Sequence, residues 1–289
     1  MALVFDKIIL FGDSITQLAY NQEFGFCFGP AMQDGKVILA YLNLEGRKQS
    51  HPFAVYNRRL DVVQRGFGGY TSNHGAIIVD RLIEQESTGA SKIKLLVVFF
   101  GTNDSIVPES ASNNSVPVER YQDNLRKIIS AAQKVGAKVV LIGPGPFNHQ
   151  QFDDALGHQF EVDRTTHRAR EYCDATVDVG NELGIPTVPM WHLVMEEIGW
   201  REGDPIYGLP ELPAVNPLND YLTFLETVAE KLSITGLHFS GRAYKILFTN
   251  VLKAIKESYP ELDPDNIPEH LPTWEQLTTS LDVLKKAIE

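Results

Sequence analysis

Short runs of apolar residues alternate along the chain with longer stretches in which apolar and polar residues are mixed. The apolar runs are rich in β-branched residues, and glycine or proline marks most of their ends. Runs of this kind are typical of strands that are buried on both faces of a sheet. They predict strands at residues 8–11, 62–63, 95–100, 139–142 and 185–189.

The stretches between these runs have the spacing of amphipathic helices. Residues 121–134 place Leu125, Ile128, Ile129 and Ala132 on one helical face. Ser240 is a suitable N-cap for another helix, which should end at Tyr259-Pro260 and bury Ala243, Leu247, Val251 and Ile255. The alternation of strand and helix predicts an α/β fold, a three-layer αβα sandwich around a central parallel sheet of about five strands.

A parallel sheet also predicts where chemistry takes place. Ligands of such sheets bind beyond the carboxyl ends of the strands, near the point where the strand order reverses. We therefore expect the functional residues in the segments that directly follow Phe11, Arg65, Phe100 and Ile142.

Two regions depart from the alternation. Residues 35–52 interrupt the connection between the first helix and the second strand, and we interpret them as an insertion. Residues 199–221 combine prolines and aromatic residues with little periodicity. A loop of that length in a compact domain is often a lid or a pocket wall.

The C-terminal residues 260–289 follow a single domain at residues 1–259. They begin as a linker with Pro260, Pro264, Pro268 and Pro272. Thr273 and Gln276 then form a capping box for a last helix, whose apolar stripe comprises Trp274, Leu277, Leu281, Leu284 and Ile288. This helix is expected to dock on the parent domain; the alternative is that it forms an interface with another copy of the chain.

The composition of the chain argues against several classes of partner and structure. The 26 basic and 37 acidic residues give a net charge of −11, which argues against nucleic acids and anionic membranes as partners. The two cysteines, Cys27 and Cys173, are too few for a disulfide framework or a cysteine zinc site. The chain shows neither a signal peptide nor an apolar run long enough to span a membrane, so we expect a cytoplasmic protein.

The segments at the predicted strand ends contain the groups that acyl transfer requires. Ser14 follows the first strand, Gly69 the second and Asn103 the third, and His238 immediately precedes the helix at Ser240. A serine hydroxyl becomes a nucleophile when a nearby base such as histidine takes its proton. The tetrahedral intermediate then needs fixed N–H donors, which Asn103 and the Ser14 and Gly69 backbones can supply. Singly, Ser14 could be only a helix cap, Gly69 and Asn103 turn residues, and His238 a helix-start histidine.

These blocks resemble the SGNH or GDSL hydrolase superfamily. That family is recognised by four blocks carrying Ser, Gly, Asn and His, which occur here in order as Gly12-Asp13-Ser14-Ile15-Thr16, Gly69, Gly101-Thr102-Asn103-Asp104 and His238. The resemblance covers residues 5–260, and the similarity is closer to the isoamyl acetate-hydrolysing esterase group. It implies the flavodoxin-like SGNH fold, with Ser14 as nucleophile, His238 as general base and the Ser14, Gly69 and Asn103 N–H groups as oxyanion hole.

One departure from the family concerns the catalytic acid. The family's last block reads Asp-x-x-His, but the residue three before His238 is Thr235. A neutral partner in place of the triad Asp lowers the rate about 10⁴-fold in serine proteases. We consider three explanations: a working Ser-His dyad, a carboxylate from elsewhere such as Glu226 or Glu230, and an engineered or lapsed enzyme.

The sequence therefore predicts a serine esterase for small acetate-type esters, which needs no cofactor or metal and is weakened by Thr235 in place of the triad Asp. The alternatives are a catalytically impaired ligand-binding protein with the same fold and an acyltransferase that uses the same serine. We take Asp13, Phe26 and Phe28 as candidate substrate-binding residues, with core packing as the alternative for the two phenylalanines. The expected partner is a small-molecule ester.

Overall fold

The computed structural model describes residues 4–33, 55–87, 89–156, 163–206, 217–222, 236–272, 274–278 and 282–288. At its centre is a five-stranded sheet of order β2-β1-β3-β4-β5, in which every neighbouring pair is parallel. The strands are β1 Lys7–Gly12, β2 Asp61–Gly66, β3 Ile93–Phe99, β4 Lys138–Gly143 and β5 Thr187–Pro189. The predicted parallel sheet is confirmed.

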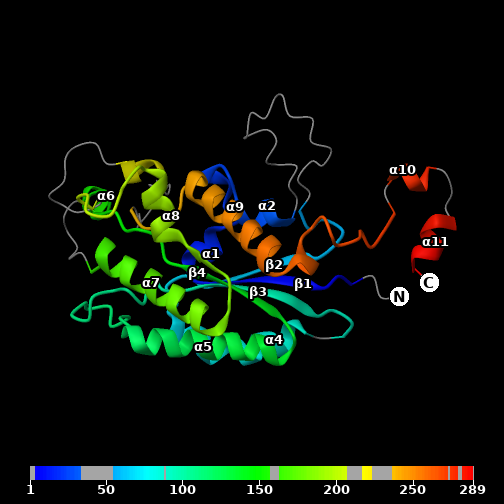
Figure 1. Cartoon of the computed structure of the whole chain (residues 1–289), viewed down its shortest axis with the longest axis horizontal. Helices are drawn as coiled ribbons and strands as arrows, with labels where there is room; N and C mark the ends of the chain where they lie inside the picture. The colour runs from blue at the N-terminus through cyan, green and yellow to red at the C-terminus, as the bar shows by residue number, and fades with distance from the viewer. Residues whose placement is uncertain are drawn as a thin grey trace.

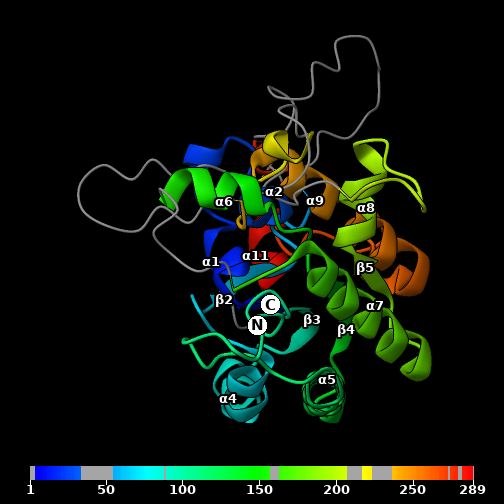
Figure 2. The ribbon, with the colours of Figure 1, turned by 90° about the vertical axis from the view of Figure 1, so that its left-hand side faces the viewer.

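Helices cover both faces of the sheet, as the three-layer prediction requires (Figures 1 and 2). Helices α4 (Ser72–Glu86) and α5 (Val118–Lys134) cover one face. On the other face lie α1 (Ser14–Leu18), α2 (Phe28–Gln33), α8 (Met190–Glu197) and α9 (Gly241–Ser258). Helix α7 (Thr166–Leu183) packs on β4 and β5, and α6 (His149–Leu156) lies beyond the strand ends.

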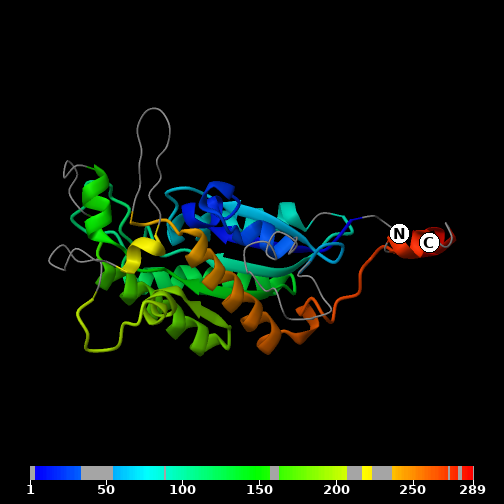
Figure 3. The ribbon, with the colours of Figure 1, turned by 90° about the horizontal axis from the view of Figure 1, so that it is seen from above.

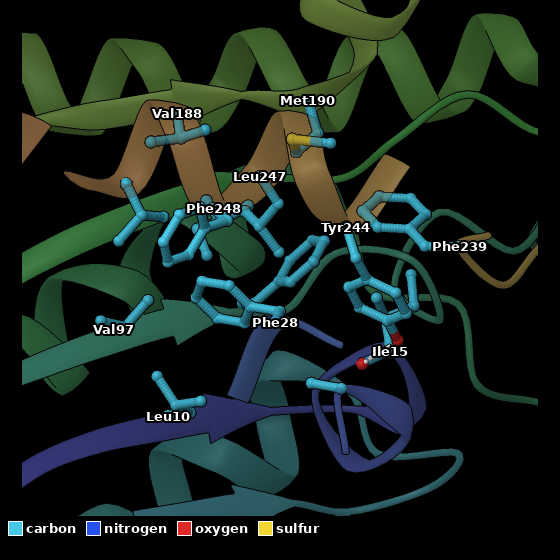
Figure 4. Close-up of a cluster of buried hydrophobic side chains, with 14 of the residues drawn as sticks. Leu10, Ile15, Phe28, Val97, Val188, Met190, Phe239, Tyr244, Leu247 and Phe248 are labelled. Carbon is cyan, nitrogen blue, oxygen red and sulfur yellow. Dashed lines mark hydrogen bonds between the residues drawn. The ribbon is translucent and has the colours of Figure 1, made fainter. Parts of the chain in front are cut away.

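Two hydrophobic cores explain why the strands are apolar on consecutive positions. Leu95, Val97 and Phe99 point into the core shared with α9, whereas Leu96 and Val98 point into the core shared with α4 and α5. Figure 4 shows part of the first core, between β1, β3 and α9. Complete burial of each such side chain stabilises the fold by about 1.5–3 kcal/mol.

The predicted helices are also confirmed. The amphipathic pattern at residues 121–134 corresponds to α5, which buries Leu125, Ile128, Ile129 and Ala132. The Ser240 hydroxyl caps α9 by accepting a hydrogen bond from the Arg242 backbone N–H. Helix α9 ends at Ser258, directly before Tyr259-Pro260.

The strand order fixes where a site can form. The chain starts at β1, passes to β2 on one side and returns to β3 on the other, so the order reverses between β1 and β3. The helical connections after these two strands depart toward opposite faces, which is the arrangement where ligands of parallel sheets bind at the carboxyl ends. Ser14 directly follows β1 and Asn103 follows β3, so both lie at this point of the sheet.

The C-terminal linker is held on the domain by two arginines. Arg58 donates to the backbone carbonyls of Leu271 and Pro272, and Arg59 donates to that of Ile267 at 2.8 Å. Beyond the linker, α10 (Trp274–Leu277) and α11 (Asp282–Ile288) lie away from the sheet, and Trp274 is 70% exposed (Figures 1 and 3). The docking of the last helix, on the parent domain or on another copy, stays a prediction.

Several other expectations concern residues outside the described ranges. These are the insertion at 35–52, the Thr273 cap and the middle of the irregular loop at 199–221. Among the helices that the structure does describe, none has the length and apolar character needed to cross a membrane.

Candidate active site

Ser14 and His238 are 224 residues apart in the chain and adjacent in space. Ser14 is the first residue of α1 and lies at the carboxyl end of β1. His238 lies in the short segment before α9, and its Nε2 is 3.0 Å from the Oγ of Ser14. This is the contact that a general base needs to take the hydroxyl proton.

The segment that carries His238 is fixed by its neighbours. Gly236 has a φ of +75°, and a Cβ there would lie 2.3 Å from the carbonyl oxygen of Asn148. The Asn148 backbone N–H donates to the Gly236 carbonyl at 2.8 Å. Tyr244, on α9, donates its hydroxyl to the Ile15 carbonyl at 2.7 Å, which ties the helix after His238 to the helix of Ser14. These contacts set the distance between His238 and Ser14.

Three N–H donors lie on the segments that surround Ser14. The Asn103 Nδ2 donates one hydrogen to the Tyr70 carbonyl at 2.9 Å, which leaves its second hydrogen for a ligand. Within the described part of the chain, the backbone N–H groups of Ser14 and Gly69 have no hydrogen-bond acceptor. Gly69 has a φ of +77°, a conformation that glycine adopts without strain.

Gln17 connects the Gly69 loop to the nucleophile helix. Its Oε1 accepts a hydrogen bond from the Gly68 backbone N–H at 2.7 Å, and its backbone carbonyl accepts one from the Gln64 side chain at 3.0 Å. The side chain therefore sets the position of the peptide before Gly69 relative to Ser14. Gln17 directly follows the Gly12-Asp13-Ser14-Ile15-Thr16 block, and the sequence analysis assigned it no role.

Asp104 holds the Asn103 turn against the start of α4. Its carboxylate accepts hydrogen bonds from the Ser72 backbone and hydroxyl and from the Gly101 backbone. Burial raises the pKa of Asp104 to about 6, although these hydrogen bonds act in the opposite direction. This hydrogen-bond network gives Asp104 a structural role, which the Gly101-Thr102-Asn103-Asp104 block of the sequence did not indicate.

Asp13, a candidate substrate-binding residue in the sequence, is a buried helix cap in the structure. Its side chain is 0% exposed, and its Oδ1 caps α1 by accepting the Ile15 backbone N–H at 2.9 Å. Burial raises the pKa of Asp13 to about 7, and the nearby Asp104 charge adds to this effect. The Ile15 hydrogen bond, the Thr102 hydroxyl and the Arg164 guanidinium oppose it.

This raised pKa predicts that Asp13→Asn stabilises the protein above neutral pH. Folding favours the protonated carboxyl, so the stabilising contribution is present below pH 3.8 and is lost as the pH rises toward 7. Asparagine keeps the cap and removes the buried charge, although it also loses the attraction of Arg164. We expect a gain of about 1–3 kcal/mol in unfolding free energy at pH 8.

Thermal and denaturant unfolding between pH 4 and pH 8 measure this gain. The difference between Asp13→Asn and the unmodified chain should grow with pH across the titration of Asp13. A difference that stays constant with pH would contradict the buried-charge argument. Glu182→Gln, which removes a carboxylate exposed on the surface, is the matched control.

Phe26 and Phe28 belong to the core and not to a surface that a substrate reaches. Phe28 is 3% exposed and lines a small apolar cavity with Tyr244 and Leu247 (Figure 4). Phe26 is 8% exposed and packs edge-on against Phe248, with 5.6 Å between ring centroids. The core-packing alternative therefore describes both residues, since Phe28 at the start of α2 and Phe26 just before it both lie against residues of α9.

Thr235 lies outside the described residues, as do Glu226 and Glu230. The structure therefore places neither the threonine nor the two suggested substitutes for a triad carboxylate. By contrast, the candidate site includes a buried arginine that the sequence analysis missed. Arg164 donates from Nη2 to the Oδ1 of Asn103 at 3.3 Å. It lies outside the recognised blocks, so the motif pattern gave no signal for it.

Comparison with known proteins assigns the family. Residues 10–246 match the GDSL-like Lipase/Acylhydrolase family. The chain belongs to that family. It is 28% identical over 277 residues to the isoamyl acetate-hydrolyzing esterase of Saccharomyces cerevisiae, covering 93% of this chain and 94% of the yeast protein. A human protein, isoamyl acetate-hydrolyzing esterase 1 homolog, is 24% identical over 277 residues, covering 94% of this chain and 88% of the human one.

A solved structure has a similar fold. The acetylxylan esterase of Geobacillus stearothermophilus aligns with a TM-score of 0.51 at 15% identity, covering 88% of this chain and 96% of that one. At this identity the likeness shows a shared fold alone. As a member of the GDSL-like Lipase/Acylhydrolase family, the protein is a carboxylic ester hydrolase.

Proposed function

We propose that this GDSL hydrolase cleaves small acetate-type esters through an acyl-enzyme on Ser14. The observation that carries the proposal is the 3.0 Å approach of His238 Nε2 to Ser14 Oγ. His238 takes the hydroxyl proton while Oγ attacks the ester carbonyl carbon, and the carbonyl oxygen becomes an oxyanion. The intermediate collapses, and the alcohol leaves with the proton from His238. Water then repeats the sequence on the acyl-enzyme and releases the acid.

The oxyanion is stabilised by the N–H groups of Ser14 and Gly69 and by the free hydrogen of the Asn103 amide. Two of these donors belong to the backbone, and the third is held by its bond to the Tyr70 carbonyl. Such donors need no reorganisation during the reaction, and one of them is worth about 10²–10³-fold in kcat.

The names of the curated relatives support the substrate class. Several are named for the hydrolysis of isoamyl acetate, a short acyl group on an aliphatic alcohol, and the match spans nearly the whole of both chains. We extend this class to the present chain. Because Thr235 stands where the family places an acid, we further propose that the activity is weaker than that of relatives with the full triad.

Two measurements test the proposal together. In a series of p-nitrophenyl esters from acetate to octanoate, kcat/KM should be highest for the shortest acyl chains. A p-nitrophenyl alkylphosphonate should inactivate the enzyme, and peptide mass spectrometry should find the adduct on Ser14.

Ser105→Ala serves as the control for labelling. Ser105 lies two residues after Asn103, and its hydroxyl donates to the Thr102 carbonyl, so the variant should be labelled like the unmodified enzyme. An adduct on another residue would reject Ser14 as the nucleophile. A preference for octanoate would reject the acetate-type substrate while leaving the mechanism in place.

A further inference from the structure

Arg164 places a buried positive charge beside the candidate oxyanion hole. Its side chain is only 14% exposed, and Nη1 donates to the Oδ1 of Asp163 at 2.7 Å. Nη2 donates to the Oδ1 of Asn103 at 3.3 Å. Asp163 is itself held, because its Oδ2 accepts the Ser110 hydroxyl at 3.0 Å. A buried guanidinium is costly unless it is paired, so this arrangement fixes both the charge and its direction.

The bond from Arg164 determines which way the Asn103 amide faces. The Oδ1 accepts from the guanidinium, and the Nδ2 donates to the Tyr70 carbonyl at 2.9 Å. In the flipped amide, two donors would face each other at Arg164 and two acceptors at Tyr70. The opposite orientation is therefore excluded on chemical grounds, and the second Nδ2 hydrogen has one fixed direction.

The same bond strengthens the amide as a donor. A hydrogen bond to the carbonyl end of an amide polarises the group and strengthens the hydrogen bonds that its N–H groups donate, by about 10–30% per bond in condensed phase. The charge of the guanidinium adds to this effect because the surroundings are buried. Arg164 thus acts on an oxyanion at one remove, through an amide that it holds and polarises.

We propose that Arg164 is a positioning residue for ester hydrolysis that acts through Asn103, which rests on the proposed place of Asn103 in the oxyanion hole. An amide that is fixed and polarised binds the transition state better than the ground-state ester. The contribution therefore belongs to kcat and not to KM.

A double-mutant cycle between Arg164 and Asn103 tests the proposal. Arg164→Met, measured with p-nitrophenyl acetate, should lower kcat about 10–100-fold and change KM less than about threefold. In the Asn103→Ala background the same substitution should change kcat less than about threefold, because the amide is no longer there. Arg164→Lys, which keeps the charge, should recover part of the activity.

Folding is checked by circular dichroism and thermal unfolding. If Arg164→Met does not fold, the cycle is run with Arg164→Lys, whose smaller loss should likewise vanish in the Asn103→Ala background. An equal loss of kcat in both backgrounds, or a change in KM alone, would overturn the role of Arg164. A harmless Asn103→Ala would instead reject the proposed oxyanion hole, so the two failures are distinguishable.

Arg168 provides the matched control. It also contacts this turn, through hydrogen bonds from Nε to the Ser105 carbonyl at 3.0 Å and from Nη2 to the Ile106 carbonyl at 3.4 Å, but it does not contact Asn103. Arg168→Met should keep kcat within about threefold of the unmodified enzyme. A loss as large as that of Arg164→Met would show that general loosening of the turn explains both results.

Discussion

Ser14→Ala is expected to lower kcat by at least about 100-fold with p-nitrophenyl acetate as substrate. Removal of the nucleophile costs a serine protease with a full triad about 10⁶-fold, and the residual rate comes from substrate binding and the oxyanion hole. The loss is smaller here because Thr235 stands in place of the triad acid, whose absence alone costs about 10⁴-fold. The same donors remain here, because alanine keeps the backbone N–H at the start of α1. The hydroxyl contacts His238 Nε2 at 3.0 Å, so its loss removes the acyl-enzyme route as a whole.

Initial rates and a thermal unfolding curve of the same preparation measure the effect. The unfolding temperature should change little, because Ser14 is partly exposed and alanine is well tolerated in the first turn of a helix. A fall in kcat of less than about tenfold would exclude Ser14 as the nucleophile. In that case the phosphonate should inactivate Ser14→Ala as fast as it inactivates the unmodified enzyme.

The fold was predictable because the composition of a strand indicates whether one or both of its faces are buried. A strand buried on both faces needs apolar residues at every position, and residues 95–100 show such a run where the structure has β3 at Ile93–Phe99. The boundaries were less predictable: the sequence favoured residues 62–63, whereas β2 is Asp61–Gly66. Among the described strands, β2 pairs with β1 alone, at the edge of the sheet, and its residues are half buried, which weakens the apolar signal.

Site residues were predictable where residue types suited to acyl transfer directly follow strands that are adjacent in the sheet. Ser14 and Asn103 follow adjacent strands of a parallel sheet, so their proximity follows from the strand order. His238 was found because its block stands directly before a capped helix. Arg164 was not predictable, because it reaches Asn103 from a segment between α6 and α7 that no periodicity connects to the strand ends.

Misassigned residues show the same limit of pattern reasoning. Asp13, Phe26 and Phe28 were interpreted as substrate contacts because they lie close to Ser14 in sequence. The turn into α1 buries Asp13 as a cap, and the segment that leads into α2 places the two phenylalanines in the core. Closeness along the chain does not determine which face of the sheet a side chain joins.

Thr235→Asp is expected to raise kcat/KM by at least about tenfold. The position three residues before His238 is where the family carries its catalytic acid, and threonine offers a neutral hydroxyl there. A carboxylate stabilises the imidazolium that forms when His238 takes the Ser14 proton, and a neutral partner in serine proteases is about 10⁴-fold less effective. The introduced charge should also raise the pKa of His238, so the acidic limb of the pH profile of kcat/KM should move to higher pH.

Thr235→Asn is the matched control for this gain. Asparagine has nearly the size of aspartate and also forms hydrogen bonds, but it carries no charge. We therefore expect kcat/KM and the acidic limb of its pH profile to stay close to those of the unmodified enzyme. Equal rises in both variants would mean that shape and not charge matters at residue 235. An aspartate variant with unchanged or lower kcat/KM would show that this enzyme does not use its family's third catalytic residue, and a Ser14-His238 dyad would then be the operating mechanism.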